Sequence, residues 1–142
     1  YLYSKDEAAA LRDKMIAFLE LMFENGDYGF YHGHFCDIHR DQARLYYASK
    51  KDEEMVLHHL EKATDHAIKF IDFMRSEQYT HSSLLFKGME RCSKGVMLAG
   101  RDNSAMKTLK HLDRKEYEFM KDRPEFRQFR ERLLPYAGKN EY

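Results

Sequence analysis

The sequence has little of what stabilises secreted proteins or anchors membrane proteins. Cysteine occurs only at positions 36 and 92 of the 142 residues, with no CxxC pair and no secretory leader. This pattern disfavours a disulfide framework and indicates two free thiols in a reducing compartment. No apolar run approaches the length of a membrane-spanning helix. We therefore expect a cytoplasmic protein with no membrane partner.

The chain has no excess of charge of either sign. It contains 24 Lys and Arg residues against 24 Asp and Glu residues, with no run of like charge. A domain that binds nucleic acid through its own surface is usually basic or carries a basic stripe, because neutralising phosphate supplies most of the affinity. Direct contact between these residues and DNA is therefore not expected.

The sequence also lacks the motifs of common catalytic sites. It has no Gly-rich phosphate loop and no GxSxG. The acidic run 52–54 lies at an expected helix start, where negative charge complements the helix dipole, and Glu116 and Glu118 lie on a polar face. Neither group resembles a desolvated acid–base pair. We expect no enzymatic activity, and a core that needs no cofactor.

The strongest pattern in the chain is apolar spacing of helical period in the stretch 30–74. Its second half carries one stripe at steps of four and three, and its first half carries a weaker one. Between them, 49–52 is short and polar, and Asp52 can cap the second helix. A connection that short predicts an antiparallel hairpin. The stripe residues are Val56, Leu60, Ala63, Ala67, Phe70 and Met74 in the second half, and Phe35, Ile38, Leu45 and Tyr46 in the first.

Further helices are expected on both sides of this hairpin. Ser4 and Glu7 form a capping box before a helix over 5–23, and Asn103 or Ser104 can cap a later one. A short helix over 80–90, a loop over 94–101, a helix started by the segment 122–125 and a frayed tail after Pro135 complete the chain. The apolar faces are Leu11, Met15, Phe18, Leu19, Met22 and Phe23 in the first helix, Met106, Leu109 and Leu112 in the later one, and Phe126, Phe129, Leu133 and Leu134 in the last.

No stretch has a convincing period of two, and the only two prolines lie near the end of the chain. The sequence therefore predicts one all-α domain over 1–142, built from about five to seven helices in pairs joined by short turns. Helix pairs of this kind are typical of stacked helical-hairpin repeats.

The hairpin resembles the tetratricopeptide repeat in three segments, 46–47, 51–57 and 60–63. In that repeat, paired aromatic residues on the first helix, a Gly-Asp turn and small or apolar residues on the second helix interlock. Lys51 stands where the repeat usually has its turn glycine, Arg44 where it has a small residue, and Ile68 where it has a proline. The resemblance implies a degenerate, right-handed superhelix whose second helix runs on to about Met74.

A broader resemblance covers most of the chain. The segments FENGDYGFYH, DIHRDQARLYYA, LHHLEKATDHAIKF, YTHSSLLF and FMKDRPEFRQFRERL are similar to the region that follows the DNA-binding module in lambda-repressor-like helix-turn-helix regulators of Gram-positive bacteria. The resemblance implies a regulatory domain that senses a protein or peptide, or dimerises, while a separate upstream domain contacts DNA. The start at Tyr1 without methionine suggests an excerpt from such a protein. A free-standing scaffold that joins two other proteins is the alternative.

One cluster suggests a different class of function, a metal sensor or metal enzyme. His32, Cys36 and His39 lie at steps of four and three and share a helix face, with His34 beside them. His58, His59 and His66 on the partner helix can supply further ligands. The spacing matches no standard zinc motif, so we expect polar residues at a helix end and interface rather than a metal.

Two surfaces are candidates for partner binding. In stacked hairpins the first helices line the concave wall, where polar residues are free to hold an extended partner. The wall residues are Asp37, Arg40, Asp41 and Arg44, with Tyr47 beside them. An aromatic edge of Tyr28, Phe30 and Tyr31 is the candidate contact for a homodimer, or else covers the core beneath the turn.

Overall fold

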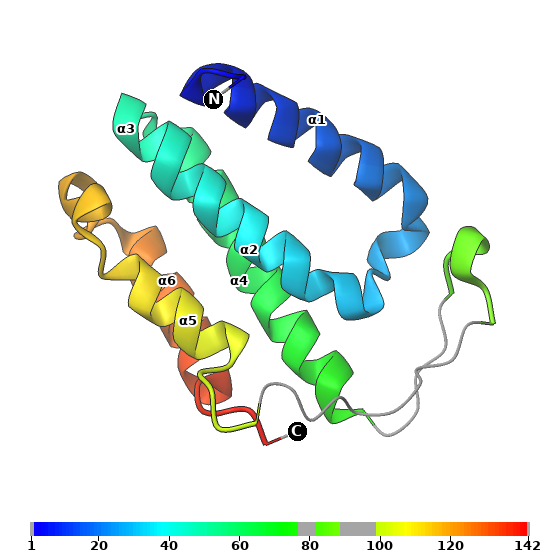
Figure 1. The fold of residues 1–142 in the computed structure, drawn as a ribbon. Coiled ribbons are helices and arrows are strands. Elements are labelled where there is room, and N and C mark those ends of the chain that lie inside the picture. Colours follow the sequence, from blue (N-terminus) through cyan, green and yellow to red (C-terminus); the bar gives the residue numbers. More distant parts are fainter. Residues whose placement is uncertain (1, 77–81, 89–98, 142) are drawn as a thin grey trace.

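The computed structural model describes residues 2–76, 82–88 and 99–141, and these residues form an all-α fold (Figure 1). Apart from an isolated bridge between Asp102 and Lys139, the described residues contain no β-structure. The α-helices are α1 (Lys5–Met22), α2 (His32–Gln42), α3 (Ala48–Lys50), α4 (Glu53–Arg75), α5 (Ser104–Leu112) and α6 (Pro124–Leu133). Short turns of helix are η1 (Glu24–Gly26), η2 (Gly29–Tyr31), η3 (Ala43–Tyr47), η4 (Leu84–Phe86), η6 (Lys115–Met120) and η7 (Leu134–Tyr136). The predicted all-α class is confirmed.

The central hairpin is formed by α2 and α4, which pack along each other. α1 lies against the α2 side of this pair, and α5 and α6 lie against α4 (Figure 1). The turn at Lys51 and Asp52 reverses the chain, and the Asp52 side chain accepts a hydrogen bond from the backbone N–H of Met55. Both the hairpin and its cap agree with the sequence analysis. Lys51 adopts φ +54°, the left-handed conformation that glycine tolerates best.

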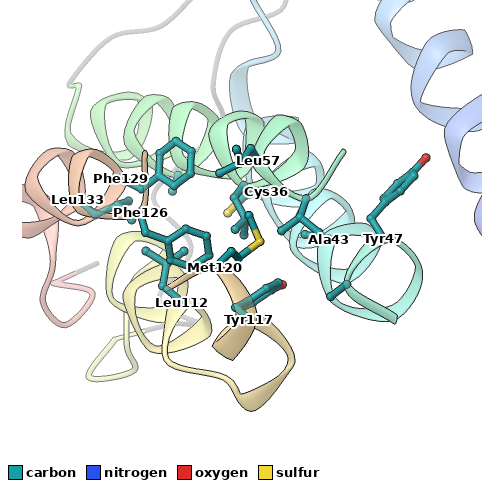
Figure 2. Packing of buried hydrophobic residues seen from close by; sticks show 14 of the residues in the cluster. Cys36, Ala43, Tyr47, Leu57, Leu112, Tyr117, Met120, Phe126, Phe129 and Leu133 are labelled. Atoms are coloured by element: carbon teal, nitrogen blue, oxygen red, sulfur yellow. The ribbon is translucent and has the colours of Figure 1, made fainter. Parts of the chain in front are cut away.

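The core lies between the hairpin and the C-terminal helices. The predicted stripe of α4 is buried throughout, and Leu60 is fully enclosed. Gly33 permits α2 to approach α4 closely, because a Cβ there would lie 3.3 Å from the Phe70 ring. Figure 2 shows the apolar cluster in which α2 and α4 meet α5, η6 and α6. Its large members from the C-terminal half are Leu112, Tyr117, Met120, Phe126, Phe129 and Leu133.

The expected stripe of the first hairpin helix is wrong beyond Phe35. Ile38 and Tyr46 are only half-buried and Leu45 is exposed, whereas Tyr47 is buried. The physical reason for the shift from Tyr46 to Tyr47 is that η3 is a π-helical turn, which inserts an extra residue and moves the inward positions by one. Ile38 lies before this turn, on the flank of α2 between the buried Phe35 and His39. The inward face of α2 and η3 is instead His32, Phe35, Cys36, His39, Gln42, Ala43 and Tyr47.

The expected buried face of α1 is wrong in part. The capping box and the helix end are as predicted, and Phe23 is buried. Ala9 and Ile16 are the buried positions within the helix, while Leu11, Met15 and Phe18 are exposed. α1 is apolar on more than one side, and its main contacts with the rest of the fold run along α2 and η3. Periodicity alone did not identify which side packs.

The C-terminal region also differs from expectation at its ends. Asn103 caps α5 as predicted, but α6 is preceded by Arg123 at the cap position rather than by Asp122, and Leu134 is exposed. The tail is held rather than frayed, because the N–H of Asn140 donates to the Arg101 carbonyl at 2.8 Å.

The short helix expected over 80–90 is represented among the described residues by the single turn η4. Its remaining residues outside 82–88, and residues 94–98 of the expected loop, lie outside the described residues.

Candidate functional site

An open cavity of about 520 Å³ lies between α2 and α5. We call it the α2–α5 groove. It is lined by Asp37, Arg40, Asp41, Arg44, Lys107, Lys110, His111 and Arg114. Four of these residues are the charged residues that the sequence analysis placed on a binding wall, and the structure brings them together. The fifth, Tyr47, is buried against α1 and does not line the groove.

Positive charge dominates the α2–α5 groove, although the whole chain is neutral. Five lining residues are Arg or Lys and two are Asp. Arg40 pairs with Asp37, and Arg44 lies 3.7 Å from Asp41. Lys107 is exposed and has no ion-pair partner among the residues that the structure describes. Lys110 pairs with Asp102, and Glu116 lies 3.2 Å from Arg114 and 3.9 Å from Arg44. Lys107 is therefore the one lining cation without an ion-pair partner in the described part of the chain.

Arg40 is held in place by the helix across the groove. Its side chain is mostly buried, and one guanidinium nitrogen donates to Thr108 Oγ1 at 3.3 Å. His111 Nε2 lies 3.0 Å from the Arg40 carbonyl oxygen and 2.7 Å from the Tyr117 hydroxyl. Burial, and next the Arg40 guanidinium, lower the pKa of His111 to about 4. His111 is thus a neutral group that fixes the groove floor, surrounded by a positive field.

The candidate metal ligands of the sequence analysis are not placed together. Cys36 is fully buried and directs its Sγ to Thr108 Oγ1 at 3.5 Å, toward α5. His32 and His39 instead contact α4, and His34 is exposed. Within the described residues no group of three His, Cys, Asp or Glu side chains is arranged to hold a metal ion. Burial also raises the pKa of the Cys36 thiol, so it is a poor nucleophile.

A row of four buried histidines lies in the interface between α2 and α4. The sequence analysis expected polar residues at this interface but not their pairing. The Nδ1 atoms of His32 and His66 lie 2.8 Å apart, as do those of His39 and His59. The rings of His39 and His66 stack with centroids 5.6 Å apart, which joins the two pairs. We call these four residues the histidine row. Its sequence signal is the spacing of seven on each helix, which places two imidazoles on one face.

The histidine row ends at a carboxylate from α1. Asp13 Oδ1 lies 3.8 Å from His59 Nε2, and Asp13 accepts hydrogen bonds from Gln42 Nε2 at 2.8 Å and from the Tyr47 hydroxyl at 2.7 Å. Three buried atoms here, His39 Nε2, His59 Nε2 and Gln42 Oε1, have no hydrogen-bond partner in the part of the chain that the structure describes. The row is therefore a polar interface inside an otherwise apolar core.

Burial keeps the histidine row neutral. It lowers the pKa of His32 and His59 to about 4, that of His66 to about 3 and that of His39 to about 2. Neighbouring histidines lower the pKa of His39 and His66 further, whereas Asp13 opposes the shift at His59. At neutral pH all four rings are uncharged.

The three residues that were expected to form an oligomer contact differ in their exposure. Tyr28 is half-buried, with its ring centroid 4.6 Å from that of Phe35 and 5.2 Å from that of His66. Phe30 and Tyr31 are exposed at 50% and 42% of their surface. The α1 helix adds to this apolar surface with Leu11, Met15, Phe18 and Leu21. Two of the three predicted residues are therefore available to a partner, and the third belongs to the core.

Comparisons of the chain with protein-family models, curated proteins and solved structures found no match. None of the described helices is both long enough and apolar enough to span a bilayer. The functional argument therefore depends on the geometry and charge of the sites above.

Proposed function

We propose that this chain is a non-catalytic interaction domain that binds an extended acidic segment of a protein or peptide in the α2–α5 groove. The observation that carries the proposal is the meeting of the charged face of α2 with the cations of α5 around one open cavity. Carboxylates of a ligand would pair with Lys107, which has no ion-pair partner among the described residues. They would also compete with the chain's own carboxylates for the other four cations of the groove.

The position of the groove supports a peptide ligand. α2 and α4 form one helix pair, and α5 and α6, which pack on each other and on α4, form the next. In a tetratricopeptide-like stack the first helices of successive pairs face the concave side, and we propose that α2 and α5 are those helices. Lys107 is exposed there and has no ion-pair partner among the described residues, so it can contact a partner directly.

The lining residues favour a peptide over nucleic acid. Apart from His111 the groove has no aromatic side chain on which a base can stack. Asp37 and Asp41 would repel a continuous phosphate backbone, whereas a peptide can place neutral residues beside them. The domain is also neutral overall, without the long-range attraction of basic nucleic-acid-binding domains.

We further propose that this binding is regulatory. The resemblance to helix-turn-helix regulators supports a cytoplasmic sensing domain that changes the geometry of an attached DNA reader when its ligand binds. Self-association is a second function, favoured by the exposed apolar residues of α1 together with Phe30 and Tyr31. The two functions use different surfaces, so separate substitutions test them.

Fluorescence anisotropy with labelled peptides tests the binding function. The probes are an Asp-rich peptide and the matched peptide with Asn at the same positions. We expect the Asp-rich peptide to bind and its affinity to fall with added salt. Lys107→Glu should weaken binding about tenfold or more, because it adds repulsion where attraction is lost. The proposal fails if neither peptide binds.

The matched control is Lys14→Glu, which makes the same charge change on the exposed side of α1, away from the groove. It should leave the affinity within about twofold of the unsubstituted domain. Equal losses for the two variants would show that net charge rather than the groove determines binding. If the Asp-rich and Asn-rich peptides bound equally well, the groove would still be a peptide site, but it would have no preference for acidic residues.

A further inference from the structure

The two faces of α2 have different partners. One face meets α4 through His32 and His39 of the histidine row, and the neighbouring face carries Arg40 of the α2–α5 groove, with Arg44 following in η3. Anything that separates α2 from α4 therefore also removes one wall of the groove. The row is the polar part of that interface, and protons are the ligand to which its four imidazoles can respond.

We propose that the histidine row is an acid-operated latch: it holds α2 on α4 while its rings are neutral, and it releases α2, and with it the groove, when they take up protons. The consequence for ligand binding depends on the function proposed above. The latch itself depends only on the packing of the row.

The contact geometry explains why neutral rings hold the latch. A neutral imidazole has one N–H donor and one acceptor nitrogen, so the Nδ1 of one ring can donate to the Nδ1 of the other across 2.8 Å. When both rings of a pair are protonated, two N–H groups face each other and no acceptor remains. The stacked rings of His39 and His66 then also bring two positive charges together.

The groups around the row oppose protonation over most of its length. Lys62 lowers the pKa of His39 and of His66, and Lys69 lowers the pKa of His32 and of His66. Both lysines belong to α4. His58, also on α4, lowers the pKa of His39 and of His59. The carboxylates that oppose this effect lie near the two ends of the row. Asp27 raises the pKa of His32, and Asp13 raises the pKa of His59. Tyr28 and Tyr47 cover the ends with their rings.

The direction of the pH effect follows from the lowered pKa values of the row. Each histidine has a pKa of about 6.5 when unfolded, and burial lowers it to about 4 or less in the fold. Below pH 6.5 the open chain binds more protons than the closed one, so acid favours opening. The contribution of the neutral row to the stability of the closed state is fully present above this pH and is lost as the pH falls. Because four histidines take up protons on opening, the stability of the closed state falls steeply with pH.

The experiment follows helix content by circular dichroism and ligand binding by anisotropy of the labelled Asp-rich peptide, from about pH 8 to about pH 4. We expect a reversible, cooperative loss of helix between the unfolded pKa near 6.5 and about pH 4, with uptake of more than one proton. Peptide binding should disappear in the same transition. Asp rather than Glu is used in the probe because its lower pKa keeps it charged over more of the range.

The test variant is His39→Phe combined with His59→Phe, which removes one contact pair but keeps two stacking rings. Its acid midpoint should fall by about half a pH unit or more, and it should take up fewer protons. The control is His34→Phe, because His34 is exposed and is not among the groups that shift the pKa of the row histidines. The control should keep the midpoint of the unsubstituted chain.

Three results would overturn the latch. The first is an unsubstituted chain that remains folded at about pH 4. The second is an equal midpoint for the buried double variant and the exposed His34→Phe control. If the buried double variant does not fold, NMR of the imidazole C–H groups of the unsubstituted chain decides the question. If the C–H signals of the four row histidines titrate one by one while the chain stays folded, this third result contradicts the latch. If these signals change only when the helices unfold, the result supports it. Peptide that stays bound below the transition removes only the link to the groove.

Discussion

The hydroxyl of Tyr47 donates a hydrogen bond of 2.7 Å to Asp13 Oδ2, which fastens α1 to the central hairpin. Figure 2 shows Tyr47 directed away from the rest of the apolar cluster, toward α1. The π-turn η3 produces this direction, because it turns Tyr47 rather than Tyr46 inward. A single local irregularity thus determines how the first helix attaches to the fold.

Tyr47→Phe should lower the free energy of unfolding by about 1 to 2 kcal/mol. The substitution keeps the ring and its stacking on His59, but removes a hydrogen bond to a carboxylate. Urea unfolding followed by circular dichroism measures the change. Tyr46→Phe is the matched control, because the Tyr46 hydroxyl contacts only Lys50 at the surface, and it should change stability by less than about 0.5 kcal/mol. Equal effects of the two variants would contradict the role of Asp13 as the anchor of α1.

Lys51→Gly should stabilise the domain. Lys51 has φ +54°, a conformation that costs a residue with a Cβ about 1 to 2 kcal/mol but is free for glycine. Glycine also loses more entropy on folding, by about 0.5 to 1 kcal/mol, so a net gain of up to about 1 kcal/mol is expected. Thermal or urea unfolding provides the measurement. Lys50→Gly, one residue earlier and still helical, should instead destabilise the domain.

The parts of the fold that could be predicted are those in which one pattern dominates locally. α4 has a regular apolar stripe and a capping aspartate, so its start and the six stripe residues follow from capping and spacing. Six further buried residues of α4, His59 and His66 among them, do not. The charged wall on α2 could also be located, because residues at steps of three and four share a face whatever packs behind them. Its partner surface on α5 could not be located, since nothing local places two helices about 70 residues apart side by side.

Other features depend on tertiary contacts that spacing does not encode. The π-turn adds one residue without any proline or glycine to mark it, which displaced the expected stripe from Tyr46 to Tyr47. The histidines were expected as polar residues at a helix end and interface, but spacing does not show that their Nδ1 atoms pair across the hairpin. α1 offers apolar residues on two sides, and only the assembled fold decides which side is enclosed.

The exposed apolar side of α1 leads to a prediction about oligomeric state. Leu11, Met15 and Phe18 lie at steps of four and three along this helix and are 44%, 51% and 65% exposed. Contiguous apolar surface of this kind usually marks a contact with another protein, and a second copy is the partner always present. Light scattering over a range of concentrations should therefore show a dimer that dissociates on dilution.

Two double variants locate that contact. Met15→Ser with Phe18→Ser should give a monomer that retains its helix content, because neither side chain is buried. Phe30→Ser with Tyr31→Ser tests the aromatic edge predicted from sequence, and it should weaken the dimer only if that edge belongs to the same interface. Leu84→Ser with Leu85→Ser removes two equally exposed apolar residues from η4 and serves as the control. A monomer at every concentration would exclude self-association and leave the α2–α5 groove as the site through which this domain acts.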